Sequence, residues 1–236
     1  MFDITKTKAV LWDLDDTLYS RINAARQLFP GMFRKYLYCD KSDAFIEEAA
    51  DYLLTQIPRN KTMHPDAFRA LGEKYPFDKP LNMAACTDYY YSHYRSFMKP
   101  FPEQLEVIRK LKSIGVKNAI VTNITPELLE LQKKKVATLG IADLFDLIIY
   151  SAEFGIHKPD PRIFDHAARQ LGVPNDACVF VGDDPNSDVA GALSAGMEVV
   201  WLDNWRTYDG SYLGHPCVHR VHSVSEYFPY LRATSP

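Results

Sequence analysis

Several classes of protein are excluded by what this sequence lacks. It contains no stretch of 18 apolar residues, so no transmembrane helix is expected, and Met1–Lys6 lacks the apolar centre of a secretory signal. The net charge is −3 without a basic stripe, which argues against a nucleic-acid-binding surface. No internal repeat or low-complexity segment is evident. We therefore expect neither a membrane nor a nucleic-acid polymer as a partner, and the sequence gives no basis for a protein partner.

Cysteine is scarce and follows no motif. The chain has four cysteines, none of them in a C-x-x-C pair, and Cys178 lies in an apolar run. Disulfides persist in oxidising compartments and are rare in the cytosol. We therefore predict reduced thiols and a cytoplasmic location.

The length and apolar content of the chain are sufficient for a large fold. The chain has 236 residues, and its hydrophobic fraction of 47% is ordinary for a globular protein. This length suits one large domain or a core with an insert. A chain of this size buries roughly 70% of its unfolded surface, so a sizeable core is expected.

Strands and helices alternate in the sequence from Lys99 onward. Pro102 begins a helix that ends at Gly115, with apolar residues at helical spacing from Leu105 to Ile114. Such alternation predicts a parallel sheet with helices on both faces. The other elements expected are strands at 118–123, 145–150, 178–181 and 199–202, and helices at 125–139, at 160–171, from Ser187 or Asp188 to about Gly196, and at 225–231.

The segment 19–98 interrupts this alternation. It is rich in helix formers and shows no clear strand, so we predict an inserted helical domain. Its aromatic residues could form a stacking platform for a base or a flavin ring. Tyr90, Tyr94 and Phe97 share one helical face, however, which favours packing inside the insert. Helices are expected at 22–38, 42–57, 65–75 and 81–97.

The most informative feature of the chain is a pair of acids at the end of the first predicted strand. Ala9–Trp12 is a short apolar run, and Asp13 and Asp15 follow it. Strand side chains repeat every two residues, so both carboxylates point the same way if both belong to the extended exit of the strand. Carboxylates this close repel unless a cation intervenes. We infer a carboxylate nucleophile beside an acid/base, with a divalent metal between them.

Other polar residues follow the later strands. Thr122 and Asp183 lie at strand exits, and Lys158 lies in a loop after a strand. Parallel sheets bind ligands beyond the carboxyl ends of their strands, so we expect these side chains to gather near Asp13.

These residues occur in an order that is itself specific. Together they resemble the four motifs of the haloacid dehalogenase-like hydrolase superfamily, and the resemblance covers the whole chain. The matching segments are Asp13–Leu18, Val121–Asn123, Lys158–Pro159, and Gly182–Asp183 with Asp188.

The resemblance implies a fold and a domain arrangement. The fold is an α/β, Rossmann-like three-layer core around a parallel sheet, with an inserted α-helical cap domain. An insert between the first two motifs resembles the C1-capped phosphatase branch. The core is then expected at 1–18 and 99–236, and the cap at 19–98.

The resemblance also implies a role for each matching residue. Asp13 is the nucleophile that forms an aspartyl phosphate, and Asp15 protonates the leaving oxygen and later deprotonates water. Thr122, Asn123 and Lys158 bind the phosphoryl group. Magnesium is bound by Asp13, the backbone carbonyl of Asp15, and Asp183, with Thr17 and Asp188 in support.

Several polar residues near these motifs keep open roles. Asp184 stands where the family often has serine, and it either tunes metal affinity or faces water. His157 touches the substrate or is a solvated loop residue. Arg21 and Arg206 grip a distal anion of the substrate or lie on the surface. The basic run Lys133–Lys135 is predicted to form a solvated helix face.

The leading interpretation is a magnesium-dependent phosphatase of a small phosphomonoester. Nucleoside monophosphates, sugar phosphates and flavin mononucleotide are candidate substrates, and the aromatic residues of the insert slightly favour nucleotides. A 2-haloacid dehalogenase of the same superfamily needs neither a metal nor a leaving-group acid, so Asp15 and Asp183 argue against it. A phosphomutase stays an alternative. A non-catalytic binding or regulatory module predicts a broken motif, and none is found.

Overall fold

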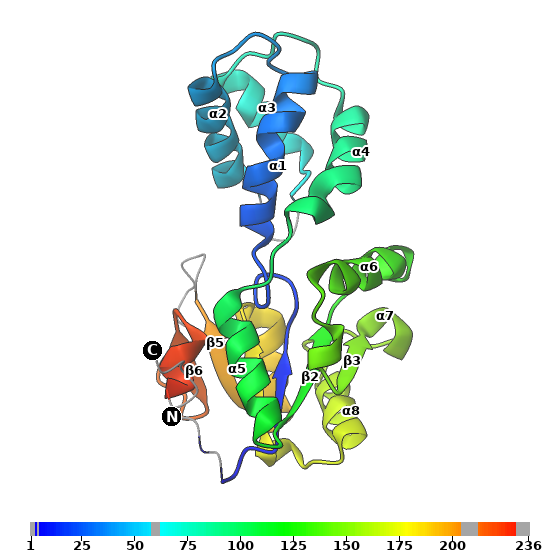
Figure 1. Ribbon diagram of the computed structural model, residues 1–236, viewed down its shortest axis with the longest axis vertical. Coiled ribbons are helices and arrows are strands. Elements are labelled where there is room, and N and C mark those ends of the chain that lie inside the picture. Colours follow the sequence, from blue (N-terminus) through cyan, green and yellow to red (C-terminus); the bar gives the residue numbers. More distant parts are fainter. Residues whose placement is uncertain (1–2, 4, 58–61, 204–211, 230–236) are drawn as a thin grey trace. The chain divides into compact units, whose positions relative to one another are not determined.

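A computed structural model describes residues 3, 5–57, 62–203 and 212–229. The described residues form one parallel sheet of six strands in the order β3-β2-β1-β4-β5-β6, with helices packed against it (Figure 1). The parallel α/β sheet predicted from the alternation is confirmed. The strands are β1 (Ala9–Trp12), β2 (Lys117–Thr122), β3 (Leu147–Tyr150), β4 (Cys178–Gly182), β5 (Glu198–Leu202) and β6 (Val218–Val221).

Strand β1 lies in the interior of the sheet, and every one of its side chains is apolar and buried. It pairs with β2 on one side and β4 on the other. Leu11 belongs to the cluster that packs under helices α8 (Pro161–Leu171) and α9 (Ala190–Ser194), whereas Trp12 stacks on Phe228. The Trp12 indole also donates a hydrogen bond to Asn118 Oδ1 at 3.1 Å. A continuous apolar run is typical of a parallel strand that is covered on both faces.

The helices of the core connect successive strands and cover the sheet. Several end at a glycine with positive φ, as Gly140 and Gly172 do, because glycine accepts this conformation without a Cβ penalty. Asp160 caps α8 by accepting from the Arg162 backbone N–H at 3.0 Å. The α-helices are α5 (Pro102–Ser113), α6 (Leu129–Leu139), α7 (Ser151–Phe154), α8 (Pro161–Leu171), α9 (Ala190–Ser194) and α10 (Val224–Tyr227).

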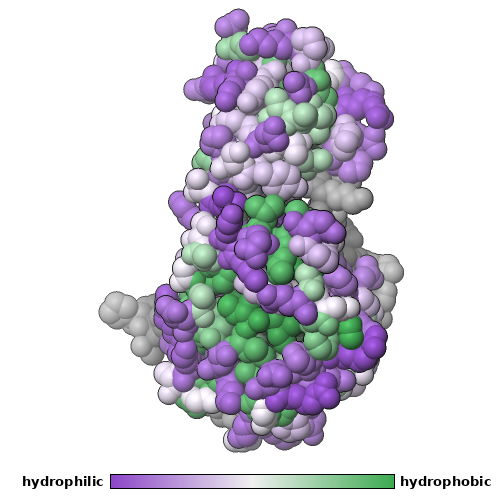
Figure 2. Space-filling view, turned by 90° about the vertical axis from the view of Figure 1, so that its right-hand side faces the viewer, coloured by the Kyte–Doolittle hydropathy of each residue, from purple (hydrophilic) through white to green (hydrophobic). Residues whose placement is uncertain are grey.

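Shorter helical turns join these elements. They are the 3₁₀ turns η2 (Pro126–Leu128), η3 (Ala142–Leu144) and η4 (Asn175–Ala177), and the π-helical turn η5 (Pro185–Val189). At the β3 edge of the sheet, Leu147 and Ile148 are half-buried. Figure 2 shows apolar side chains gathered on this side of the core.

Residues Ser20–Lys99 form a second compact unit, and the remainder of the chain forms the first. The chain leaves the core after Tyr19 and re-enters it at Pro100, and these two residues pair in an isolated bridge. Among its described residues the insert is helical, with α1 (Arg21–Tyr36), α2 (Asp43–Gln56), α3 (Pro65–Lys74), α4 (Met83–His93) and the 3₁₀ turn η1 (Tyr94–Phe97).

Aromatic side chains form much of the interior of this helical unit. Tyr90 and Tyr94 are buried and stack with ring centroids 4.7 Å apart, and Tyr90 lies 6.4 Å from Phe29. Phe97 is half-buried, and Tyr91 is 48% exposed. The predicted packing of Tyr90 and Tyr94 inside the insert therefore agrees with the structure.

Several predicted boundaries are wrong at the level of single turns. The last core helix before β5 begins after Asp184, which accepts from the Asn186 backbone N–H, and not at Ser187 or Asp188. Strand β3 begins at Leu147, because a 3₁₀ turn precedes Phe145. Strand β6 was not predicted, since its charged, partly exposed residues resemble a loop. The predicted end of the final helix, Leu231, lies outside the described residues.

No described helix has both the length and the apolar character needed to cross a lipid bilayer.

Helix α5 offers a matched test of which side chains hold the core. Ile108 is fully buried, whereas Ile114, which was predicted to continue the same helical spacing, is 45% exposed because the helix ends before it. We expect Ile108→Ala to lower the free energy of unfolding by about 2–5 kcal/mol, and Ile114→Ala to change it by about 0.5 kcal/mol or less. If urea denaturation shows equal losses of unfolding free energy for the two variants, the assignment of Ile108 to the core and of Ile114 to the surface is wrong.

Candidate active site

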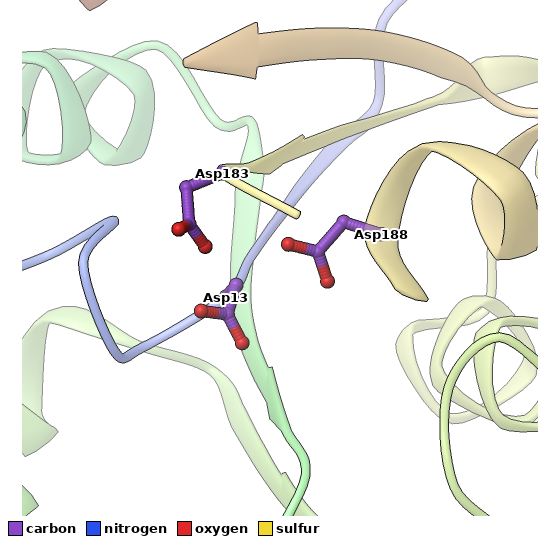
Figure 3. A group of neighbouring side chains, drawn as sticks. All are labelled: Asp13, Asp183 and Asp188. Carbon is purple, nitrogen blue, oxygen red and sulfur yellow. The ribbon is translucent and has the colours of Figure 1, made fainter. Parts of the chain in front are cut away.

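Three acidic side chains converge at the carboxyl edge of the sheet. Asp13 follows β1, Asp183 follows β4, and Asp188 lies in η5. All three are buried, and one carboxylate oxygen of each lies within 4.8 Å of those of the other two. Figure 3 shows the three carboxyl groups close together. The predicted gathering of Asp13 and Asp183 is therefore present in the fold.

One buried lysine pairs with this cluster. Lys158 Nζ donates to Asp13 Oδ1 at 2.6 Å and lies 2.8 Å from Asp188 Oδ1. Burial disfavours the charged form of Lys158, but the two carboxylates outweigh it, so the pKa of Lys158 lies above its ordinary value. Lys158 is therefore a fixed positive charge at the site.

The Asp13 carboxyl group is strongly perturbed. Burial raises the pKa of Asp13 to about 7, with Lys158 opposing this shift and the charges of Asp188 and Asp15 adding to it. The cause is the removal of a carboxylate from water beside other acids. Without a further cation, the site holds more negative charge than Lys158 alone can balance.

The donor set fits a divalent cation. The three buried carboxylates supply hard oxygen atoms, which magnesium prefers to nitrogen or sulfur. Three acids face one lysine here, and a divalent ion would relieve their mutual repulsion. The chemistry of these residues is therefore suited to magnesium.

Asp188 is held by several donors and needs a glycine beside it. Its Oδ2 accepts from the Asp184 backbone N–H at 3.0 Å, while its Oδ1 faces Lys158. A Cβ atom on Gly182 would collide with the Asp188 carboxylate. The glycine at the end of β4 therefore lets this acid approach the strand.

The Asp15 carboxylate is held by three donors. Gln132 Nε2 donates to its Oδ2 at 2.8 Å, and Lys135 Nζ donates to its Oδ1 at 2.9 Å. The Tyr19 hydroxyl also donates to Oδ1. Asp16, next in the chain, takes a positive φ of 63°, which aspartate tolerates better than most residues.

The contacts on helix α6 correct one prediction and add a residue that sequence reasoning missed. The run Lys133–Lys135 is not uniformly solvated, because Lys135 reaches Asp15 while Lys134 is exposed. Gln132 was not considered, although it is fully buried. Gln132 and Lys135 are three residues apart on the helix that follows Thr122, and this spacing places them on one face.

Thr122 and Asn123, at the end of β2, have different partners. The Thr122 hydroxyl is buried and accepts from Gln132 Nε2 at 2.8 Å. The Asn123 amide bonds the backbone of Lys158 twice, accepting from its N–H at 2.8 Å and donating to its carbonyl at 2.9 Å. This geometry makes Asn123 a clamp on the Lys158 loop.

The remaining candidate residues have these positions. Thr17 is buried, and its hydroxyl has no hydrogen-bond partner among the described residues. His157 is exposed, and its Nδ1 lies 2.8 Å from Ser151 Oγ. Asp184 caps the turn η5, and Arg21 begins α1 in the helical unit. Arg206 lies outside the described residues.

Comparison with models of protein families finds a match over most of the chain. The model of the haloacid dehalogenase-like hydrolases matches residues 7–196. The chain belongs to this family. The family resemblance drawn from the motifs is therefore confirmed, and so is the Rossmann-like fold expected from it.

Several known proteins are similar to this member of the family. A glyceraldehyde 3-phosphate phosphatase of Methanopyrus kandleri is 33% identical over 86% of each chain. A pyrimidine 5′-nucleotidase of Escherichia coli is 28% identical over 82% of this chain and 85% of its own. A hydrolase of the superfamily from Bacillus subtilis, solved with magnesium, shares the fold with a TM-score of 0.68 at 18% identity, covering 97% of this chain and 100% of its own.

The raised pKa of Asp13 predicts a pH-dependent stability in metal-free protein. Asp13 has a pKa of about 7 in the folded chain and about 3.9 when unfolded. Between these values the folded state binds more protons, so the Asp13 contribution to stability falls as pH rises through this window. We expect Asp13→Asn to raise the melting temperature relative to wild type by more at pH 8 than at pH 5.

Differential scanning calorimetry in the presence of a chelator measures this difference. The same difference at both pH values would contradict the raised pKa.

The Gly182–Asp188 contact predicts a costly substitution. Gly182→Ala forces the Asp188 carboxylate away from Lys158, and overpacking of this kind costs about 1–3 kcal/mol. Gly31→Ala is the matched control, because the atom nearest its new Cβ is the hydroxyl at the end of the Tyr89 side chain. Thermal denaturation should show a lower melting temperature for Gly182→Ala and no loss of melting temperature for Gly31→Ala. A neutral Gly182→Ala would refute the close approach.

Proposed function

We propose that this protein is a magnesium-dependent phosphatase that hydrolyses a small phosphomonoester through an aspartyl phosphate on Asp13. The observation that carries the proposal is the buried contact between Asp13 and Lys158 inside an acidic cluster. A carboxylate beside a fixed cation is suited to attack on phosphorus, since phosphoryl transfer depends on charge neutralisation and in-line positioning.

In the first step, an Asp13 oxygen bonds to phosphorus and the bond from phosphorus to the leaving oxygen breaks. Asp15 gives a proton to that oxygen, so the alcohol leaves neutral. Lys158 and the Thr122 hydroxyl hold the transferring group. Magnesium, held by Asp13, Asp183 and the backbone carbonyl of Asp15, would neutralise charge on the phosphoryl oxygens when bound.

In the second step, water attacks phosphorus and Asp15 takes its proton. The bond between Asp13 and phosphorus breaks, and inorganic phosphate and the free carboxylate result. The same residue, Asp15, thus serves first as general acid and then as general base. Asp188 and Asn123 support these steps by holding Lys158 from opposite ends, at its ammonium group and at its backbone.

The substrate is proposed to be a small soluble metabolite. Two of the relatives that match most of this chain carry the names glyceraldehyde 3-phosphate phosphatase and pyrimidine 5′-nucleotidase, and both names specify small phosphate esters. We assign residues 20–99 the role of a cap, from their insertion between the first two motifs. The free state of all four cysteines is in keeping with a cytoplasmic location.

Dehalogenation is less suited to this site. Displacement of a halide by a carboxylate needs no proton donor at the leaving group, whereas Asp15 is held beside the site by three donors. The buried cluster of three acids is also suited to a cation, which displacement of a halide does not need.

The central prediction concerns Asp13 and magnesium. Phosphate release from a panel of nucleoside monophosphates, sugar phosphates, flavin mononucleotide and p-nitrophenyl phosphate should require magnesium and be abolished in Asp13→Asn, because that variant has no nucleophile. A chelator should stop turnover, and added magnesium should restore it. The measurement is a colorimetric phosphate assay.

Asp176→Asn is the control variant, since Asp176 is exposed in the turn η4 and has no assigned part in the reaction. It should keep turnover. Full activity of Asp13→Asn or of metal-free enzyme would overturn the mechanism. Isomerised sugar phosphate without phosphate release would instead indicate a phosphomutase.

A further inference from the structure

One buried side chain, Gln132, is hydrogen-bonded to both Asp15 and Thr122. Its Nε2 donates to Asp15 Oδ2 and to Thr122 Oγ1, each at 2.8 Å. In the proposed reaction, Asp15 serves the leaving oxygen and Thr122 serves the transferring phosphoryl group. A single amide group therefore links the proposed acid/base to the proposed phosphoryl-binding hydroxyl.

The Asp15 carboxylate fixes the orientation of this amide. A carboxylate only accepts hydrogen bonds, so the NH₂ end of Gln132 must face it. The second hydrogen of the same NH₂ group then goes to Thr122, whose hydroxyl oxygen acts as an acceptor. The Thr122 hydrogen is thereby directed away from Gln132 and can be donated elsewhere, as contact with a phosphoryl oxygen requires.

The other end of the amide indicates that packing alone does not explain this residue. Gln132 is fully buried, and its Oε1 has no hydrogen-bond partner among the described residues. An unpaired buried carbonyl opposes folding, and such exceptions in native proteins call for an explanation, with a catalytic role among the candidates. An apolar side chain of similar size would fill the same space without this penalty.

Lys135 supports the same arrangement from one turn further along α6. It donates to Asp15 Oδ1, while Gln132 donates to Oδ2. The two oxygens of the carboxylate are thus held separately by two residues of one helix face, which restricts rotation of the carboxyl group.

We propose that Gln132 is a positioning residue that orients the Thr122 hydroxyl as a donor to the phosphoryl group and holds the Asp15 carboxylate in register with it. The inference rests on the proposed phosphatase function and deepens it. In this proposal, helix α6 sets the distance between the acid/base Asp15 and the phosphoryl-binding hydroxyl of Thr122. Helix α6 contributes no residue to the motifs.

The test is Gln132→Met, which keeps length and volume but removes both donors. We expect kcat to fall about 10- to 100-fold, because small errors in placement at a reacting centre have effects of this size. The melting temperature should be unchanged or higher, since the unpaired carbonyl is removed. Gln132→Leu serves as a second variant. Gln170→Met, at an exposed glutamine on α8, is the matched control and should leave kcat unchanged.

Two readouts separate positioning from a structural role. The first is the leaving group: the loss in Gln132→Met should be larger for an alkyl phosphate than for p-nitrophenyl phosphate, because only the alkoxide needs the proton from Asp15. The second is a double-mutant cycle with p-nitrophenyl phosphate. Gln132→Met should lower kcat less in Thr122→Val, which has no hydroxyl, than in Thr122→Ser, which keeps one, and the loss that remains in Thr122→Val acts through Asp15 as the base of the second step.

The possible results distinguish this inference from the function on which it rests. If the wild-type enzyme shows no Asp13-dependent phosphate release, both the proposed phosphatase function and the inference about Gln132 are wrong. Asp13-dependent turnover with kcat of Gln132→Met within about twofold of wild type, or with equal losses for both leaving groups and additive effects with Thr122→Val, would overturn the inference and leave the phosphatase intact.

Discussion

The buried ion pair between Asp13 and Lys158 is the interaction on which the rest of the site depends. A carboxylate at the end of the central strand can be buried here because a lysine from a distant loop lies 2.6 Å away. Two neighbouring residues hold that lysine in place. Asn123 is hydrogen-bonded to both its backbone N–H and its backbone carbonyl, and Asp188 faces its ammonium group. The pair alone leaves the site too acidic, and this imbalance makes it suited to a divalent cation.

The topology of the sheet explains why these groups meet. Strands β2, β1 and β4 are neighbours and run parallel, so the residues that follow them lie along one edge although the sequence separates them widely. The folding cost of gathering like charges there is offset by the apolar strands below, which are buried on both faces. Function is thus located where the sheet ends and water-accessible loops begin, as in other open α/β folds.

Sequence reasoning predicted strands β1 to β5 but not β6, and it predicted the convergence of Asp13, Asp183 and Lys158, because short apolar runs followed by polar residues have few other interpretations. It failed where tertiary contacts decide. Lys135 belongs to a basic run that is typical of a solvated face, and its contact with Asp15 follows only from how α6 packs. Gln132 belongs to no motif. Its importance lies in two hydrogen bonds that join residues 117 and 10 positions away in the chain, and periodicity cannot indicate them.

The most direct test of the account is to trap the phosphorylated enzyme. Acid quenching of the magnesium-loaded protein during turnover, followed by peptide mass spectrometry, should find a phosphoryl group on Asp13 that hydroxylamine removes, as expected for an acyl phosphate. The same group should be absent from Asp13→Asn. Steady release of phosphate with no phosphoryl group on Asp13 at any quench time, or with the group on another residue, would contradict the assignment of Asp13 as the nucleophile.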